Sequence, residues 1–270
     1  LVRLHDELAK RGIELVFFPV PVKAQVHPER LVRPSGLGAA DAGEGAGLAN
    51  PSFPELVRRL GEAGIPVYDA LPELRAAAGA GEAVYFATDT HWNAAGMRVA
   101  AAGLARFLRG EAALPPRPPA GLRRRSFPHQ FKGDLTRMLG DGIGGPIFAP
   151  ERIELDEIVG LGDLPYHTNR PSDSDVLLLG DSYSLIFASV DGGKGASFAE
   201  QLAFALDRPV RLSAKVAANG LKARVQWLRD DPAALSGARV VIYQVTARAL
   251  SSADWVSSPL QPERKKRRKP

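Results

Sequence analysis

The stretch Val176-Leu-Leu-Leu-Gly-Asp-Ser182 decides the fold. Four apolar residues in a row, without polar alternation, are typical of a strand that is buried on both faces of a parallel sheet. Gly180 follows these residues, and we expect it to let the backbone turn sharply and expose Ser182 at the edge of the sheet. Ligands in such sheets bind at the carboxyl ends of the strands, so a functional site is expected at this turn.

Strand and helix patterns alternate on both sides of this stretch. We expect further strands at residues 13–20, 65–68, 84–86, 210–213 and 240–245. We expect helices at residues 1–11, 53–60, 72–78, 93–108, 198–206 and 221–228. This alternation predicts an α/β fold, a three-layer α/β/α sandwich with a mostly parallel sheet.

Two helix starts carry capping signals. Ser52 followed by Glu55 matches a capping box, in which each side chain bonds a free backbone N–H of the first turn. Asn93 precedes an alanine-rich segment and is predicted to cap the helix that follows.

One domain is expected over residues 1–250. Four prolines within residues 114–120 divide the chain, and glycines and prolines are frequent in residues 121–173. We therefore interpret residues 114–174 as an elaborated insertion made of loops and not as a second domain. Residues 251–270 are expected to form a basic, disordered tail.

The composition is that of an ordinary globular protein, with 45% hydrophobic and 24% charged residues among 270. The sequence has no apolar run near the roughly 18 residues that a membrane-spanning helix needs. Cysteine is absent, which excludes disulfides, thiolate metal sites and a cysteine nucleophile. The chain begins at Leu1, and a membrane anchor preceding it is an open alternative.

The net charge of +5 is concentrated at the C-terminus. Six of the last seven residues are basic, and the remaining 29 basic residues face 30 acidic ones, so the body carries about −1. A basic face for nucleic acid is therefore not expected. The tail could still touch an anionic polymer or lipid headgroups.

Two predicted strand ends carry groups suited to acyl transfer. Asp89 and His91 follow the strand at 84–86, and Ser182 follows the strand at 176–179. A serine hydroxyl becomes a good nucleophile when an imidazole accepts its proton, and a carboxylate holds that imidazole in the right tautomer. We predict that Ser182, His91 and Asp89 form a catalytic triad.

Each of these motifs has a plainer interpretation. Gly-Asp-Ser is a common turn after a strand, and Asp-Thr-His is often a helix cap with a surface histidine. A metal site at Asp89 and His91 is disfavoured because no second histidine or acid lies at ligand spacing nearby, so no metal is expected. The triad is favoured because both motifs end strands of the same predicted sheet.

The two motifs resemble those of a known family. Gly180-Asp-Ser182 resembles the first block of SGNH hydrolases, and Asp89-Thr-His91 resembles their acid–histidine block. Here the acid–histidine block comes first, which resembles the circularly permuted branch, the alginate O-acetyltransferase family of AlgJ and AlgX type. Weaker likenesses are Pro19-Val-Pro-Val-Lys23, Lys132-Gly-Asp-Leu135 and the last strand leading to Arg248.

This resemblance implies an O-acetyltransferase of the bacterial periplasm. Such an enzyme acetylates hydroxyls of an exported polysaccharide, alginate or another exopolysaccharide, and receives acetyl through a membrane-bound O-acyltransferase. It implies that Ser182 carries the acetyl group, that His91 is the base and that Asp89 orients His91. No cofactor is implied.

Further roles are expected around the triad. The backbone N–H of Ser182 is the first expected oxyanion donor, and Asn219-Gly220 is a second, although it is equally well a plain turn. Lys23, Tyr183 and Arg248 are candidates for substrate contact. Lys23 and Arg248 are equally well structural ion-pair partners.

Two alternatives remain beside acetyl transfer. An esterase or deacetylase would use the same triad, because water and a sugar hydroxyl compete for one acyl-enzyme. A non-catalytic module that binds polysaccharide or scaffolds a secretion complex would not need all three triad residues. No carbohydrate-binding module follows residue 250, so a partner-dependent enzyme is expected.

Overall fold

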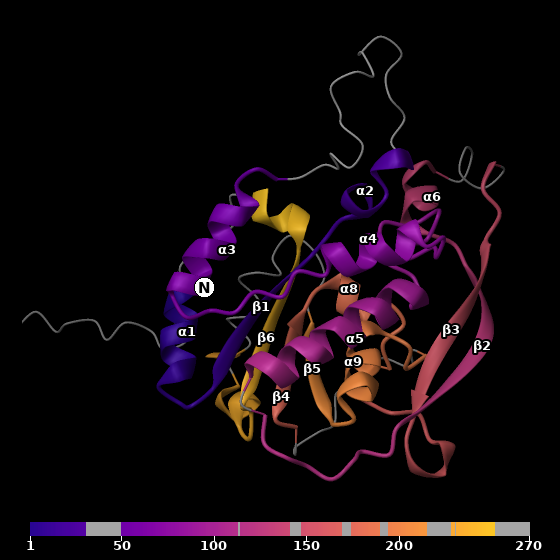
Figure 1. The fold of residues 1–270 in the computed structure, drawn as a ribbon. Helices are drawn as coiled ribbons and strands as arrows, with labels where there is room; N and C mark the ends of the chain where they lie inside the picture. Colours follow the sequence, from indigo (N-terminus) through magenta and orange to yellow (C-terminus); the bar gives the residue numbers. More distant parts are fainter. Residues whose placement is uncertain are drawn as a thin grey trace, which may run out of the picture.

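The computed structural model describes residues 1–30, 50–112, 114–140, 147–168, 174–189, 194–214, 228–229 and 231–251. Its central feature is a four-stranded sheet in the order β1-β6-β4-β5, with every pair parallel (Figure 1). The strands are β1 (Glu14–Val20), β4 (Val176–Gly180), β5 (Val210–Ala214) and β6 (Val240–Thr246). All four were predicted from the sequence, each to within one residue.

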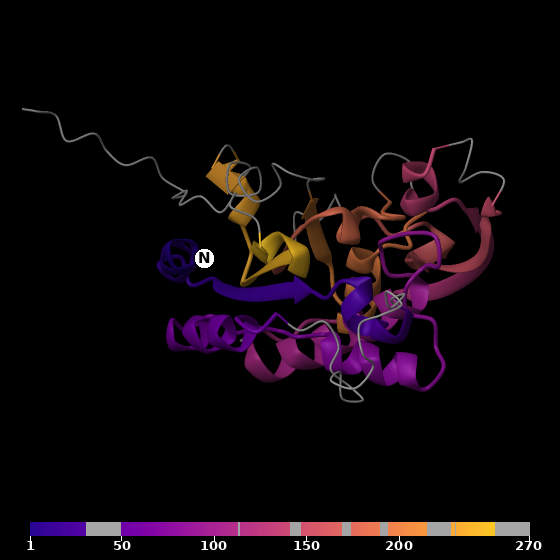
Figure 2. The same cartoon turned by 90° about the horizontal axis from the view of Figure 1, so that it is seen from above.

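Successive strand residues point to opposite faces of the sheet and build two cores. Val16 and Phe18 lie in the core covered by α4 (Leu71–Gly79), α5 (Ala94–Glu111) and α9 (Phe198–Leu206). Leu15 and Phe17 lie in the other core, with α1 (Val2–Ala9), α3 (Phe53–Glu62) and the side chains of Leu228, Ala234, Leu235 and Ala238. Figure 2 shows α5 running along one side of β1. This arrangement confirms the three-layer α/β/α sandwich.

Two predicted strands are wrong, because each contributes a single bridge. Residues 65–68 pair with the sheet only at Val67, opposite Phe17. Residues 84–86 fold back on the segment that follows them, since Asn93 N donates to Val84 O and Phe86 N donates to His91 O. Val84–Phe86 therefore begins a closed turn and is not a strand of the sheet. Its three residues are buried, which explains why the segment is apolar although it is short.

The predicted insertion contains regular structure that sequence periodicity did not indicate. β2 (Arg123–Phe131) and β3 (Glu151–Val159) form an antiparallel hairpin, and α6 (Asp134–Met138) lies at its tip (Figure 1). The hairpin is joined to α9, where Gln201 Nε2 donates to Asp156 O at 2.6 Å. The predicted helix at 221–228 and the basic tail beyond residue 251 lie outside the described residues, except Leu228.

The capping signals have different outcomes. Asn93 Oδ1 accepts a hydrogen bond from Gly96 N at 3.0 Å and caps α5 as predicted. The capping box at Ser52 is wrong, because the Ser52 side chain makes no capping bond and Glu55 binds Arg58 and Arg59. An arginine fork holds a carboxylate more strongly than a single backbone N–H does.

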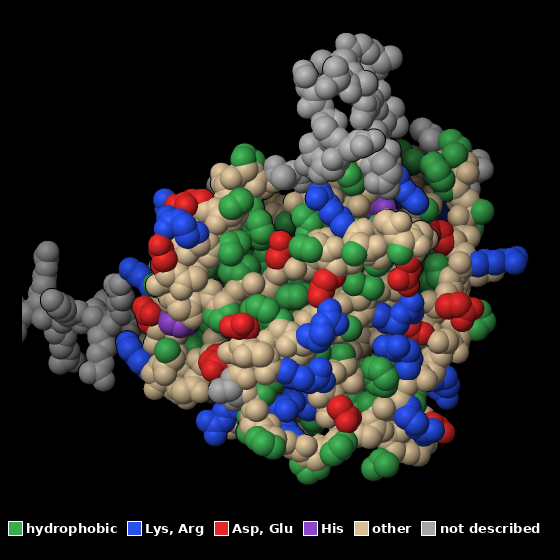
Figure 3. Space-filling view, in the orientation of Figure 1, with side chains coloured by type: hydrophobic (Ala, Val, Ile, Leu, Met, Phe, Trp, Pro, Cys, Tyr) green, Lys and Arg blue, Asp and Glu red, His purple; other side chains and the backbone are tan. Residues whose placement is uncertain are grey.

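A groove of about 320 Å³ opens where β1 and β6 end. Pro19 and Pro21 line one side, Ala247 and Arg248 line another, and Phe53 of α3 contributes a third. Green hydrophobic side chains gather in the hollow beside α3 in Figure 3.

None of the helices in the described part of the chain is long and apolar enough to cross a bilayer.

Candidate active site

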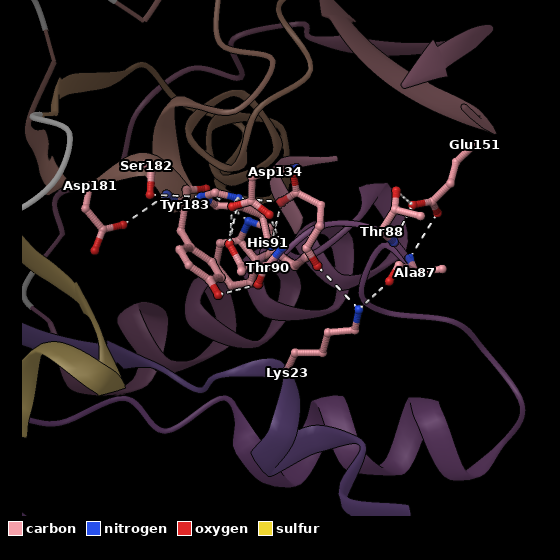
Figure 4. Close-up of polar contacts among 12 residues, drawn as sticks. Lys23, Ala87, Thr88, Thr90, His91, Asp134, Glu151, Asp181, Ser182 and Tyr183 are labelled. Atoms are coloured by element: carbon pink, nitrogen blue, oxygen red, sulfur yellow. Dashed lines mark hydrogen bonds and ion pairs between the residues drawn. The ribbon is translucent and has the colours of Figure 1, made fainter. Parts of the chain in front are cut away.

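Three side chains from two distant segments of the chain meet beyond the end of β4. Ser182 begins the short helix α8 (Ser182–Leu185), directly after the strand. His91 Nε2 lies 2.9 Å from Ser182 Oγ, and His91 Nδ1 lies 2.6 Å from Asp89 Oδ1 (Figure 4). With the ring proton on Nδ1, Nε2 is free to accept the serine proton. The arrangement is that of a nucleophile, a base and an orienting acid.

Asp89 is a buried carboxylate, only 1% exposed. Its Oδ1 accepts bonds from N and Nδ1 of His91, and its Oδ2 accepts the N–H of Asp134 at 2.7 Å. Burial by itself would raise the pKa of Asp89, but the hydrogen bonds from His91 and Asp134 outweigh it and hold the pKa below its usual value. Asp89 is therefore ionised and able to balance a protonated His91.

This lowered pKa makes a pH-dependent contribution to stability. In acid the unfolded carboxyl binds its proton first, at about pH 4, so the contribution is complete above that pH. It is lost as pH falls through the lower folded pKa. We expect the free energy of unfolding to decline more steeply below pH 4 in the wild type than in Asp89→Asn, as measured by urea unfolding at several pH values. Equal slopes would contradict this assignment.

The turn that presents Ser182 is anchored to β6 by Asp181. Asp181 Oδ1 accepts bonds from Tyr183 N and Gln244 Nε2, and Oδ2 accepts bonds from N and Oγ1 of Thr246. The chain turns directly after Gly180 as expected, but Gly180 has no positive φ, so the turn does not depend on the left-handed conformation that favours glycine. A Cβ at Gly180 would lie 2.6 Å from Ser184 Cβ, so close packing of α8 on the strand requires the glycine.

The expected oxyanion donors are only partly described. Within the described residues, the backbone N–H of Ser182 has no hydrogen-bond acceptor. It is therefore available to a developing oxyanion, and this role stays a prediction. Asn219 and Gly220 lie outside the described residues.

The segment that carries Asp89 and His91 is held by side chains from elsewhere. The carboxylate of Glu151 accepts bonds from Ala87 N and Thr88 N, and also from Thr88 Oγ1. Lys23 Nζ, half-buried in α2 (Lys23–Val26), donates to Ala87 O at 2.8 Å and Asp89 O at 3.4 Å (Figure 4). Lys23 therefore supports the segment, and its predicted contact with substrate stays a prediction.

Tyr183 packs beside His91 within the core. Its hydroxyl donates to Thr90 O at 2.6 Å, and its ring centroid lies 4.6 Å from that of His91. Trp92 Nε1 donates to Tyr183 O at 3.0 Å. Tyr183 is only 1% exposed and its hydroxyl is bound to Thr90 O, so the side chain packs in the core, and its predicted contact with substrate stays a prediction.

Arg248 lies in a short 3-10 helix after β6 (η5, Ala247–Ser251) and is exposed in the groove. Among the described residues its guanidinium has no hydrogen bond and no ion pair. Of the three residues predicted to contact substrate, Arg248 is the one that lines the groove, and its contact with substrate stays a prediction.

Two acids of the site were not singled out from the sequence. Asp134 begins α6 and Glu151 begins β3, and both contact the Ala87–His91 segment across separations of 44 to 64 residues. The only signal was the segment Lys132-Gly-Asp-Leu135, which carries Asp134 and which we used only as a weak family likeness.

Gly133 allows this close approach of the hairpin. A Cβ at Gly133 would lie 1.9 Å from Thr88 O, a backbone atom that cannot move without shifting Asp89. We expect Gly133→Ala to lower the free energy of unfolding by about 1–3 kcal/mol. We expect it to slow catalysis about 10²-fold, because a displacement of about 1 Å can have that effect.

Gly110 provides the control for this prediction. A Cβ at Gly110 meets nothing within 4 Å, so Gly110→Ala should leave activity unchanged and stability equal or higher. Thermal unfolding and an ester-cleavage assay on both variants measure the two effects. An active, stable Gly133→Ala protein would show that the contact is not required.

Asp89, His91 and Asp134 also offer ligand atoms within 4.8 Å of one another, the spacing of a metal site. The sequence had shown no second acid near His91, and the structure supplies one in Asp134. Both Asp89 oxygens already accept N–H groups, and His91 Nδ1 is bound to Asp89. The hydrogen-bonded triad therefore remains our interpretation of these residues.

Comparisons with known proteins were consistent with this geometry. Residues 1–247 match the family described as the SGNH hydrolase-like domain, acetyltransferase AlgX. The chain is 26% identical over 272 aligned positions to the probable alginate O-acetylase AlgJ of Pseudomonas aeruginosa, covering 95% of this chain and 66% of that protein. It is 31% identical over 136 positions to the protein of the same description from Pseudomonas syringae pv. tomato, covering 50% and 32%.

Two solved structures share the fold. The O-acetyltransferase domain of Pseudomonas putida AlgJ superposes with a TM-score of 0.71 at 24% identity, covering 92% of this chain and 80% of that one. Pseudomonas aeruginosa AlgX superposes with a TM-score of 0.63 at 21% identity, covering 91% and 54%. The chain thus spans no more than about two thirds of the curated relatives described here.

Proposed function

Because this chain belongs to the family of the SGNH hydrolase-like acetyltransferase AlgX, we propose that it transfers acetyl groups through Ser182 to hydroxyls of an exported bacterial polysaccharide. This membership confirms the resemblance drawn from the motifs. The observation that carries the proposal is the 2.9 Å contact between His91 Nε2 and Ser182 Oγ, with ionised Asp89 behind the imidazole. Alginate, named in the description of the relatives, is the first acceptor to consider.

The reaction has two halves. In the first, Ser182 Oγ forms a bond to the acetyl carbon while its proton passes to His91 Nε2, and the bond between the acetyl carbon and the donor breaks. The leaving group takes the proton from His91. In the second half, His91 removes the proton of a sugar hydroxyl, whose oxygen attacks the acetyl carbon. The bond to Ser182 Oγ breaks, and the serine regains a proton.

Two features support stabilisation of the charges that develop. Asp89 faces the imidazole, so it compensates the positive charge of His91 in each half-reaction. The N–H of Ser182 has no acceptor among the described residues and is suited to the oxyanion, with Asn219-Gly220 proposed as the second donor.

The groove at the ends of β1 and β6 is proposed as part of the acceptor site. It opens at the same edge of the sheet as Ser182, because β6 lies beside β4. Arg248 lines it, and a guanidinium is well suited to the carboxylate of an acidic sugar.

The family suggests where the enzyme works. We place it in the periplasm, with acetyl supplied by a membrane-bound O-acyltransferase. A membrane anchor outside this chain and a contact between the basic tail and an anionic polymer are part of this proposal.

The test is incubation with p-nitrophenyl acetate, followed by intact-mass detection and peptide mapping. We expect an acetyl adduct on Ser182 that discharges faster onto a polysaccharide than into water. An adduct that discharges only into water would favour the esterase. A folded protein that forms no adduct, also with the acyltransferase partner present, would favour the non-catalytic module.

A further inference from the structure

We propose that Asp134 is a positioning residue that holds His91 in its reactive orientation and stabilises the protonated imidazole. This inference rests on the proposed function, because it concerns the same proton transfer. It adds a second carboxylate to the triad, brought to the site by the hairpin insertion.

Asp134 binds the residue that separates the acid from the base. Its Oδ1 accepts the backbone N–H of Thr90 at 2.8 Å, and its Oδ2 accepts Thr90 Oγ1 at 2.6 Å. Its own N–H donates to Asp89 Oδ2 at 2.7 Å. Asp134 therefore fixes Asp89 through its backbone and Thr90 through its side chain, and the orientation of His91 follows from both.

The same carboxylate lies close to the imidazole. Asp134 Oδ2 is 3.8 Å from His91 Nδ1, which is too far for a hydrogen bond but within range of a strong electrostatic attraction. The Asp134 side chain is 31% exposed, so water screens part of this attraction. The attraction appears when His91 is protonated, either in acid or after it has taken the proton of Ser182.

The other polar and charged groups near His91 have different roles. Asp89 makes the direct hydrogen bond, and Tyr183 presents its ring and a buried hydroxyl bound to Thr90 O. Three more charged side chains lie near the residues around His91 and make no hydrogen bond or ion pair with His91 itself. Lys23 and Glu151 bind the backbone of residues 87–89, and the positive charge of Arg248 interacts electrostatically with Tyr183. Apart from Asp89, Asp134 is thus the carboxylate that faces His91 in the described residues.

Asp134→Asn removes the charge and keeps the contacts. The amide oxygen can accept the Thr90 N–H, and the amide nitrogen can donate to Thr90 Oγ1. A loss seen in this variant therefore reports on the charge and not on a missing side chain.

The experiment measures kcat/KM for acetylation of Ser182 by p-nitrophenyl acetate between pH 5 and 9. We expect Asp134→Asn to lower kcat about 10-fold with little change in KM. We also expect the acidic limb of its pH profile to move to lower pH by about half to one unit, the shift expected from one partly screened charge about 4 Å away. The direction follows because a weaker negative field favours the neutral imidazole in acid.

Glu151→Gln is the matched control. Like Asp134, Glu151 is a carboxylate that binds the segment carrying Asp89 and His91, but it contacts Ala87 and Thr88 and not His91. We expect it to lower stability and rate while leaving the acidic limb in place. Asp134→Glu, which keeps the charge, should restore the wild-type limb.

An unshifted limb in Asp134→Asn, with only its thermal stability lowered, would overturn the inference and leave Asp134 a structural brace. If Asp134→Asn does not fold, Asp134→Ser also removes the charge, and the position of its acidic limb tests the inference in the same way. Absence of the acetyl adduct in the wild type, also with the acyltransferase partner present, would instead refute the proposed function, so the two failures are distinguishable.

Discussion

Ser182→Ala is expected to lower acetyl transfer by at least roughly 10³-fold without disturbing the fold. The reason is that Ser182 Oγ contacts His91 Nε2 and is the atom on which the acetyl group would form. The turn around it is held by Asp181 and Gln244, neither of which binds the Ser182 side chain. Turnover of p-nitrophenyl acetate, with circular dichroism as the check on folding, measures both parts of the expectation.

Ser184 is the matched control, two residues further along α8. Its Oγ is buried and donates to Gln244 Oε1 at 2.7 Å, with no contact to His91. Ser184→Ala should therefore cost stability, on the order of 1 kcal/mol, and leave chemistry largely intact. If Ser184→Ala were the inactive variant and Ser182→Ala the active one, the nucleophile would be misassigned.

His91→Ala is expected to be nearly as damaging, with a loss of about 10³-fold. This change removes the group that accepts the Ser182 proton and leaves Asp89 without its principal partner. Asp89→Asn should cost somewhat less, because the imidazole remains next to the serine although its tautomer is no longer fixed. Rates of acetyl-Ser182 formation, followed by intact mass, compare the two variants directly.

His5→Ala serves as the control for histidine removal. His5 lies on α1 and contacts Asp6, away from the triad. It should keep wild-type activity. A His91→Ala protein that formed the adduct at the wild-type rate would show that another group is the base.

The parallel sheet could be predicted because its strands are short, continuous apolar runs. Val176–Gly180 and Val240–Thr246 are buried along their whole length, and a short continuous apolar run in an α/β domain usually forms a buried parallel strand. The hairpin could not be predicted in the same way. β2 is exposed at most positions and contains Pro128, so it lacks the apolar alternation by which strands are recognised.

The candidate triad could be proposed from sequence because its residues follow strand ends in recognisable motifs. Their supporting residues could not, because no local pattern connects Asp134 or Glu151 with the segment that they bind. Tyr183 shows that a position next to a motif in the sequence does not determine what the side chain contacts. Its position beside Ser182 suggested contact with a ligand, while packing against His91 and Trp92 turns it into the core.

Every bond that fixes the acid–histidine segment to the rest of the site joins residues far apart in the chain. The separations are 44 residues from Thr90 to Asp134, 64 from Lys23 to Ala87 and 91 from His91 to Ser182. Closing loops of this length is entropically unfavourable until the surrounding core forms, so we expect these contacts to form together with the core or after it. In a nascent or partly folded chain we therefore expect Ser182 to be unreactive, because its contact with His91 requires the native topology.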